Sequence, residues 1–200
     1  MRHATVKRET AETKIRISLN LDGKGRSDVK SSIPFLDHML TLFAKHSYCD
    51  LVVRASGDIE VDQHHLVEDI GIVLGDAIKK ALGKKTGIAR YGNFLMPMDE
   101  ALSYVAIDLS GRPYLSFMVK FRRDYARGVA GFDYSLIKEF FKALVSSAGM
   151  TLHIKTNSGE TNHHIAESVF KGFAKAFYQA CRRLPHHEGR RTVPSTKKIL

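Results

Sequence analysis

The chain has 200 residues, of which 44% are hydrophobic, and a formal net charge of +10 at pH 7. This content can fill one substantial core, and no run approaches the about 18 apolar residues that a membrane helix requires. Because the N-terminus lacks the apolar stretch of a secretory signal, we expect a cytoplasmic protein without membrane contacts. Cys49 and Cys181 belong to no CxxC motif and are expected to be reduced thiols that pack in the core.

The first half of the chain alternates strand-like and helix-like segments. Two alternating segments at 14–19 and 28–33 predict a pair of strands. An amphipathic helix is expected at about 34–45 and a short apolar strand at 51–53. The next segment, which begins near His64, has the apolar spacing of a buried helix.

The second half repeats this order. Alternating segments at 102–108 and 114–120 predict two strands, and an amphipathic helix is expected at about 134–147. A short apolar strand at 152–154 again precedes a segment with the spacing of a buried helix. Each half therefore reads β-β-α-β-α.

The repeated order predicts an α+β fold in which a β-β-α-β-α half is duplicated. We expect the two sheets and the helices to pack together as a sandwich. The chain would form a single domain over 1–200, with halves at about 8–92 and 93–184 and an irregular tail at 185–200.

Two matching blocks carry most of the chemical information. The first is His64-His65-Leu66-Val67-Glu68, and the second is His163-His164-Ile165-Ala166-Glu167. On a helix, residues three or four apart lie on one face, so each glutamate can share a cation with a histidine of its own block. Adjacent histidines diverge by about 100°, which favours two ions over one. One such block alone is more often a solvated or capping pair, but the repetition in register favours metal ligands.

An alignment of the halves on their apolar strands pairs His38 with Glu139, both of which lie on the preceding helix. Each half would then supply one helix-borne ligand and one His-His-x-x-Glu block. Such a mixed nitrogen and oxygen set suits a six-coordinate ion such as manganese better than a closed tetrahedral zinc site. The candidate ligands are His38, His64, His65, Glu68, Glu139, His163, His164 and Glu167.

Several motifs together closely resemble the imidazoleglycerol-phosphate dehydratase family of histidine biosynthesis, over nearly the whole chain from about 8 to 197. That family has a fold similar to a ribosomal protein domain. The motifs lie at 35–40, 64–69, 87–92, 98–101, 163–167 and 195–197.

The resemblance implies an enzyme with two Mn(II) per subunit that converts D-erythro-imidazole-glycerol phosphate to imidazole-acetol phosphate through a metal-bound imidazolate. Carried over by position, one metal site would hold His38, His65, Glu68 and His163, and the other His64, His164 and Glu167. Many family members have histidine where this chain has Glu139. Glu139, His153 or a water could therefore complete the second site, and His153 could equally be a packing residue of its strand.

The resemblance also implies roles in catalysis and substrate binding. Glu12, in the pattern Arg8-Glu9-Thr10-Ala11-Glu12-Thr13, would be the base that takes a proton from carbon. The catalytic candidates are Glu12, Glu68 and Glu167. Guanidinium forks and a hydroxyl beside a lysine suit phosphate oxygens, which gives Arg90, Arg112, Lys171, Ser195 and Lys197 as the phosphate-binding residues. The other expected substrate contacts are Glu12, His38, His64, Glu68 and His163.

Two alternative functions are also compatible with the sequence. The net charge of +10 and the basic segment 182–191 are compatible with a nucleic-acid-binding protein, although no aromatic-rich motif accompanies them. A dimetal phosphate-ester hydrolase is also compatible, but such sites usually use bridging aspartates.

The resemblance implies a homo-oligomer, usually of 24 subunits built from trimers, with the small-molecule substrate bound at subunit contacts and no nucleic-acid partner.

Overall fold

The computed structural model describes residues 2–122, 131–184 and 193–197. The segments 185–192 and 198–200 of the expected irregular tail lie outside the described residues. The elements in chain order are β1 (His3–Glu9), β2 (Thr13–Asn20), β3 (Ser27–Lys30), α1 (Pro34–Ser47), β4 (Asp50–Gly57), α2 (His64–Leu82), β5 (Tyr91–Met98), β6 (Ala101–Asp108), β7 (Tyr114–Met118), α3 (Leu136–Ala148), β8 (Thr151–Ser158) and α4 (Asn162–Cys181).

Each half contains one strand more than the sequence predicted, so that it reads β-β-β-α-β-α. The additional strands are β1 and β5, and each lies at the edge of its sheet. Only Ala4 and Val6 of β1 are buried, which leaves a short apolar signal. β5 contains Gly92 and Pro97, which usually argue against a strand but are tolerated at a sheet edge.

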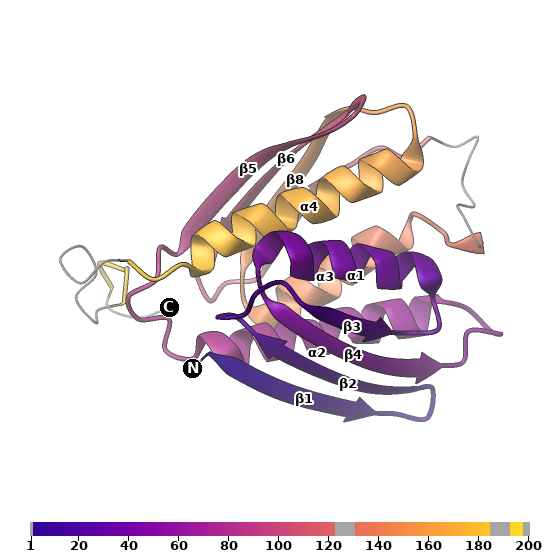
Figure 1. Ribbon diagram of the computed structural model, residues 1–200, viewed down its shortest axis with the longest axis horizontal. Helices are drawn as coiled ribbons and strands as arrows, with labels where there is room; N and C mark the ends of the chain where they lie inside the picture. Colours follow the sequence, from indigo (N-terminus) through magenta and orange to yellow (C-terminus); the bar gives the residue numbers. More distant parts are fainter. Residues whose placement is uncertain (1, 123–130, 185–192, 198–200) are drawn as a thin grey trace.

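The elements form two outer sheets with the helices between them (Figure 1). The strand orders are β1-β2-β4-β3 and β5-β6-β8-β7, so the two halves have the same topology. In the first half α2 packs on β1 and β2, and in the second α4 packs on β5 and β6. The halves meet through their helices, α2 against α3 and α1 against α4. The predicted α+β duplicated fold is therefore confirmed.

Two glycines allow α2 and α3 to approach closely. A Cβ at Gly71 would lie 2.6 Å from the carbonyl oxygen of Phe140, and a Cβ at Gly75 would lie 2.6 Å from that of Leu144. Backbone atoms cannot move aside as a flexible side chain can. The contact between the two halves therefore depends on the missing side chains of these glycines.

Both cysteines are buried free thiols, as the sequence predicted. Burial raises the pKa of the Cys49 thiol to about 11. Within the described residues, no helix combines the length and the apolar character needed to cross a membrane.

Candidate metal centres

Both His-His-x-x-Glu blocks lie in the first turn of a helix, as their sequence pattern indicated. α2 begins at His64 and α4 begins at Asn162, directly before the second block. In each half the helix follows the strand that pairs at the centre of the sheet, β4 or β8. The fold therefore places the two blocks at equivalent positions.

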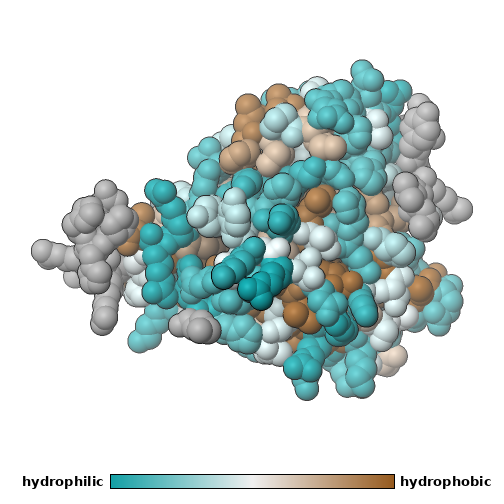
Figure 2. All heavy atoms as spheres, in the orientation of Figure 1, coloured by the Kyte–Doolittle hydropathy of each residue, from teal (hydrophilic) through white to brown (hydrophobic). Residues whose placement is uncertain are grey.

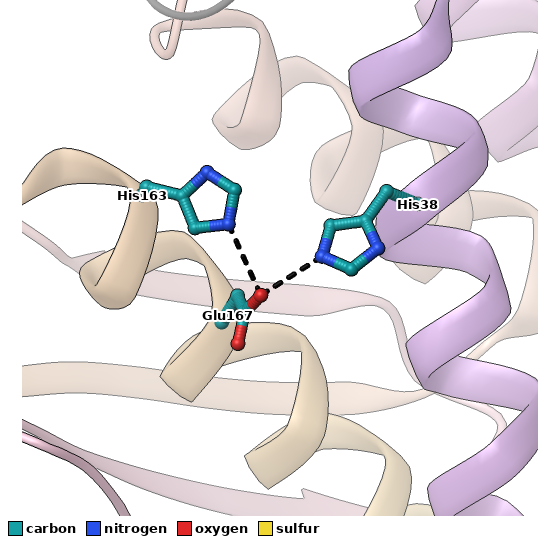
Figure 3. Close-up of side chains that lie close together, drawn as sticks. All are labelled: His38, His163 and Glu167. Atoms are coloured by element: carbon teal, nitrogen blue, oxygen red, sulfur yellow. Dashed lines mark hydrogen bonds and ion pairs between the residues drawn. The ribbon is translucent and has the colours of Figure 1, made fainter.

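The tightest group of metal-ligating side chains combines the two halves (Figure 3). His38 on α1 and His163 on α4 both point their Nε2 atoms at Oε1 of Glu167, at 2.8 Å and 3.1 Å. The two imidazole rings stack with centroids 5.7 Å apart, and the ring of Phe35 meets that of His163 edge-on. The three ligand atoms lie within 4.8 Å of one another.

Lys171, one turn further along α4, binds the second oxygen of Glu167. Its ammonium lies 2.6 Å from Oε2, which leaves Oε1 to the histidines. Burial of Glu167 favours the neutral acid, but hydrogen bonds from Lys171, His38 and His163 outweigh it and lower the pKa of Glu167 to about 2. The carboxylate is therefore charged at neutral pH.

A second group lies at the β5–β6 turn and contains Asp99, Glu100 and His164. Nδ1 of His164 is 2.7 Å from Oε2 of Glu100, and Nε2 is 3.9 Å from Asp99. The other oxygen of Glu100 accepts backbone N–H groups from Glu160 and Thr161. The bond to His164 and the N–H of Thr161 are the main causes that lower the pKa of Glu100 to about 2.

The first half has a looser counterpart of these contacts. His65 lies 3.1 Å from Asp58 and 3.7 Å from Glu12, which is in the β1–β2 turn. His64 lies 3.7 Å from Glu68. In both halves the second histidine of the block therefore faces a carboxylate of the turn between the first two strands.

These groups fit divalent metal ions by their donor chemistry. Each combines imidazole nitrogens with carboxylate oxygens, a set that binds Mn(II), Fe(II) or Zn(II). Asp58 raises the pKa of His65, and Glu100 raises that of His164, so that protons compete for the same nitrogens. Since a ligating histidine must be neutral, metal binding at these positions would release protons.

Known proteins similar to this chain agree with the geometry. A family model described as imidazoleglycerol-phosphate dehydratase matches residues 31–177. The chain belongs to this family. Relatives of that name include those of Methylorubrum populi, 51% identical over the full length of both chains, and Endomicrobium trichonymphae, 53% identical over 100% of this chain and 98% of the relative.

Solved imidazoleglycerol-phosphate dehydratases have the same fold. The Staphylococcus aureus crystal structure is 38% identical with a TM-score of 0.81, and the match covers 91% of this chain and 99% of that one. The Pyrococcus furiosus enzyme in complex with (S)-C348 is 38% identical with a TM-score of 0.82, covering 98% and 100%. The chain is therefore a hydro-lyase of histidine biosynthesis, and the family resemblance predicted from its motifs is confirmed.

The single chain groups the candidate ligands of the dehydratase differently from the division that the resemblance implied. That division placed His38 and His163 in one site and Glu167 in the other, whereas here all three lie together. Glu139 forms an ion pair with Lys142 at 3.1 Å, one turn along α3. The ligand sets, including the residue that completes the second site, stay predictions.

His153, the alternative ligand, projects from the exposed face of β8. Its ring packs against that of Tyr114 with centroids 5.6 Å apart. This contact agrees with a packing role, and the residue stays exposed.

The expected phosphate-binding residues divide into two places in the chain. Arg90 donates two hydrogen bonds to Asp108, at 2.7 Å and 3.1 Å, and a third to the carbonyl oxygen of Pro194 at 2.8 Å. Arg112 lies 3.8 Å from the same Asp108. Ser195 directly follows Pro194, and its Oγ accepts the backbone N–H of Lys197.

Lys171, in contrast, lies beside Glu167 at the metal-ligating group. The Arg90 group is also far from His164, because the two lie at opposite ends of β6. Asp108, which binds Arg90, is the last residue of this strand, and Glu100, which binds His164, directly precedes its first residue. Seven residue steps of a strand span about 23 Å.

Sequence reasoning assigned no site role to five carboxylates near the candidate site, namely Asp58, Asp69, Asp99, Glu100 and Asp108. Asp58 binds His65, Asp108 binds Arg90, and Asp69 accepts hydrogen bonds from Arg8 and from Thr13. Each follows or ends a strand or adjoins a block, so proximity to a predicted motif was a signal. The partners of Asp69 and Asp108 were not predictable, because Arg8 and Arg90 lie 61 and 18 positions away, whereas Asp58 lies only seven positions from His65.

Proposed function

We propose that this chain removes water from D-erythro-imidazole-glycerol phosphate and releases imidazole-acetol phosphate, with two Mn(II) per subunit. The observation that carries the proposal is the pair of histidine–carboxylate blocks at the starts of α2 and α4, on a fold shared with dehydratases of this family. The location in the cytoplasm stays a prediction.

The residues that would hold the metals are those of the two blocks together with His38, and Glu139, His153 or a water would complete the second site. When bound, the two ions would act as Lewis acids that hold the substrate ring as an imidazolate and stabilise the charge that develops. Within the chain, Glu167 provides an ionised oxygen, and Lys171 fixes the orientation of its carboxylate by binding the other oxygen.

Glu12 is the residue that we propose as the base. Its side chain is 56% exposed, so that it can reach a bound substrate, and it lies 3.7 Å from His65. The turn that carries it is anchored, because Thr10 accepts the N–H of Glu12 and Thr13 donates its hydroxyl to Asp69. An anchored carboxylate beside a metal-ligating histidine is well placed to take the proton from the carbon next to the departing hydroxyl.

The phosphate would be bound by Arg90, Arg112, Ser195 and Lys197. Asp108 aligns the guanidinium of Arg90 by two hydrogen bonds, and Arg112 remains 69% exposed and available. A separation of about 23 Å from the His164 group exceeds the reach of one small substrate. This separation supports a homo-oligomer, which we propose to be a 24-mer of trimers, in which one subunit binds the phosphate and another the ring.

The test combines metal content with turnover. The purified chain is stripped with chelator and Mn(II) is restored, and imidazole-acetol phosphate formation is followed. About two Mn per subunit with restored turnover is the expected result. The matched control is Glu12→Gln, which should bind the same amount of Mn and lose turnover. Release of inorganic phosphate would instead indicate a hydrolase, and two bound metals without any turnover would contradict the proposed substrate.

A further inference from the structure

The outer face of the first sheet carries a row of four cations, one on each strand. Lys7 of β1 lies directly opposite Arg16 of β2, Arg16 opposite Arg54 of β4, and Arg54 opposite Lys30 of β3. All four are exposed, while their neighbours along the strands, such as Ile17, point into the core. Like charges directly opposite one another destabilise a sheet. The stability of the sheet therefore does not explain why these four residues are cations.

Carboxylates of the chain compensate only part of this charge. Arg54 is bound by Asp28 on the neighbouring strand. In the part of the chain that the structure describes, Lys7, Arg16 and Lys30 have no ion pair. The three cations without an ion pair therefore lie on β1, β2 and β3, and the paired Arg54 of β4 separates Arg16 from Lys30. Adjacent members of the row are one strand spacing, about 4.8 Å, apart.

The row lines a hollow in the surface of about 840 Å³. This volume is within the range of small-molecule sites. The hydroxyls of Ser32 and Ser56 also line it, and Glu9, its one carboxylate, is paired with Lys14. The row lies on the face of the sheet opposite α2, whereas Arg8, which also lines the hollow, is bound by Asp69 of α2.

The second sheet shows that the row is not a property of the duplicated fold. Its equivalent row consists of Leu95, Tyr104, Lys155 and Met118, in which Lys155 occupies the position of Arg54. Figure 2 shows apolar side chains gathered over β5 and β6 at the top of the view. The row thus carries four cations in the first sheet and one in the second.

We propose that the hollow on the first sheet binds a small polyanion that carries several phosphate groups, such as an organic triphosphate. Lysine and arginine donate to phosphate oxygens, and three uncompensated cations in a row match several anionic groups better than one. Among the described residues that line the hollow none is aromatic, so they offer a nucleobase no stacking surface. This difference favours a polyphosphate over a single-stranded nucleic acid.

The experiment is calorimetric titration of the metal-loaded protein with inorganic tripolyphosphate at low and at physiological salt. Saturable binding of one ligand per chain is expected, weaker at higher salt. Each of Lys7→Gln, Arg16→Gln and Lys30→Gln should weaken binding about fivefold, and the triple variant should bind only marginally. Lys155→Gln is the matched control and should bind as the wild type does.

The triple variant should remain folded, because it relieves repulsion between like charges, and urea unfolding checks this directly. Extraction of metal by the ligand would be equal in all variants, so it cannot produce a difference between them. Equal weakening by Lys155→Gln would show attraction to the net charge alone and would overturn the proposal. So would absence of binding to the wild type, or binding of an RNA oligonucleotide without binding of tripolyphosphate.

Discussion

Replacement of Glu167 by glutamine removes one charge from the tightest metal-ligating group without changing its shape. The carboxylate binds His38, His163 and Lys171 at 2.8, 3.1 and 2.6 Å, and its side chain is only 10% exposed. An amide oxygen cannot serve three donors, and the ammonium of Lys171, which is 16% exposed, loses its counter-charge.

The expected cost follows from this burial. Removal of one partner of a buried ion pair costs about 3–5 kcal/mol, and a hydrogen bond to a charged group is worth about 1.5–3 kcal/mol. Since both side chains keep some contact with water, the metal-free variant should lose about 2–3 kcal/mol of unfolding free energy in urea. Wild-type protein should gain about 2.7 kcal/mol when Mn(II) is present at a hundredfold excess over its Kd, and the variant should gain much less.

The double variant Glu167→Gln/Lys171→Met separates the two effects. It removes the unpaired ammonium, so it should recover most of the stability of the metal-free protein but not the response to Mn(II). If Glu167→Gln unfolds at the urea concentration of the wild type, the ion pair does not stabilise the fold. An unchanged gain with Mn(II) would show that Glu167 is not a ligand.

Three further results are expected. Gly71→Ala should lower the unfolding free energy in urea by about 1–2 kcal/mol, because the cost of overpacking against α3 exceeds the gain from the higher helix propensity of alanine. The exposed control Lys80→Ala should stay within about 0.5 kcal/mol of the wild type. Cys49, whose pKa is raised to about 11, should react slowly with iodoacetamide at pH 8 until the protein is unfolded; fast native labelling would contradict its burial. Hydrogen bonds from Arg2 hold the pKa of Asp22 below its ordinary value of 3.8. The difference in unfolding free energy between the wild type and Asp22→Asn should therefore be fully present above pH 3.8. It should vanish as the pH falls through the lowered pKa of Asp22, and a difference that persists in strong acid would contradict this.

Local patterns predicted the helices and the central strands. The blocks at His64 and His163 were correctly placed at helix starts, because the apolar spacing that follows each block is long and regular. Of the four edge strands, β3 and β7 were predicted, whereas β1 and β5 were missed, because β1 has only two buried apolar residues and β5 contains Gly92 and Pro97. Pro97, which argues against a central strand, is compatible with such an edge.

The site was predictable in its residue types but not in its pairings. The repeat predicted His38 and Glu167 as candidate ligands, yet their contact joins residues 129 positions apart across two helices. The partner carboxylates Asp58 and Asp108 lie close to predicted motifs, but an acidic residue at a strand end is too common to identify its partner. The pairing of His38 with Glu167 depends on how the two halves dock, which no spacing within one half specifies.

The group in Figure 3 links the docking of the halves to the availability of metal. His38 belongs to the first half, whereas His163 and Glu167 belong to the second. A cation that needs all three ligands can bind only when α1 lies against α4, so its binding free energy adds to the cohesion between the halves. Two fragments produced by a cut between α2 and β5 would then associate more tightly in the presence of Mn(II). A chelator would weaken this association.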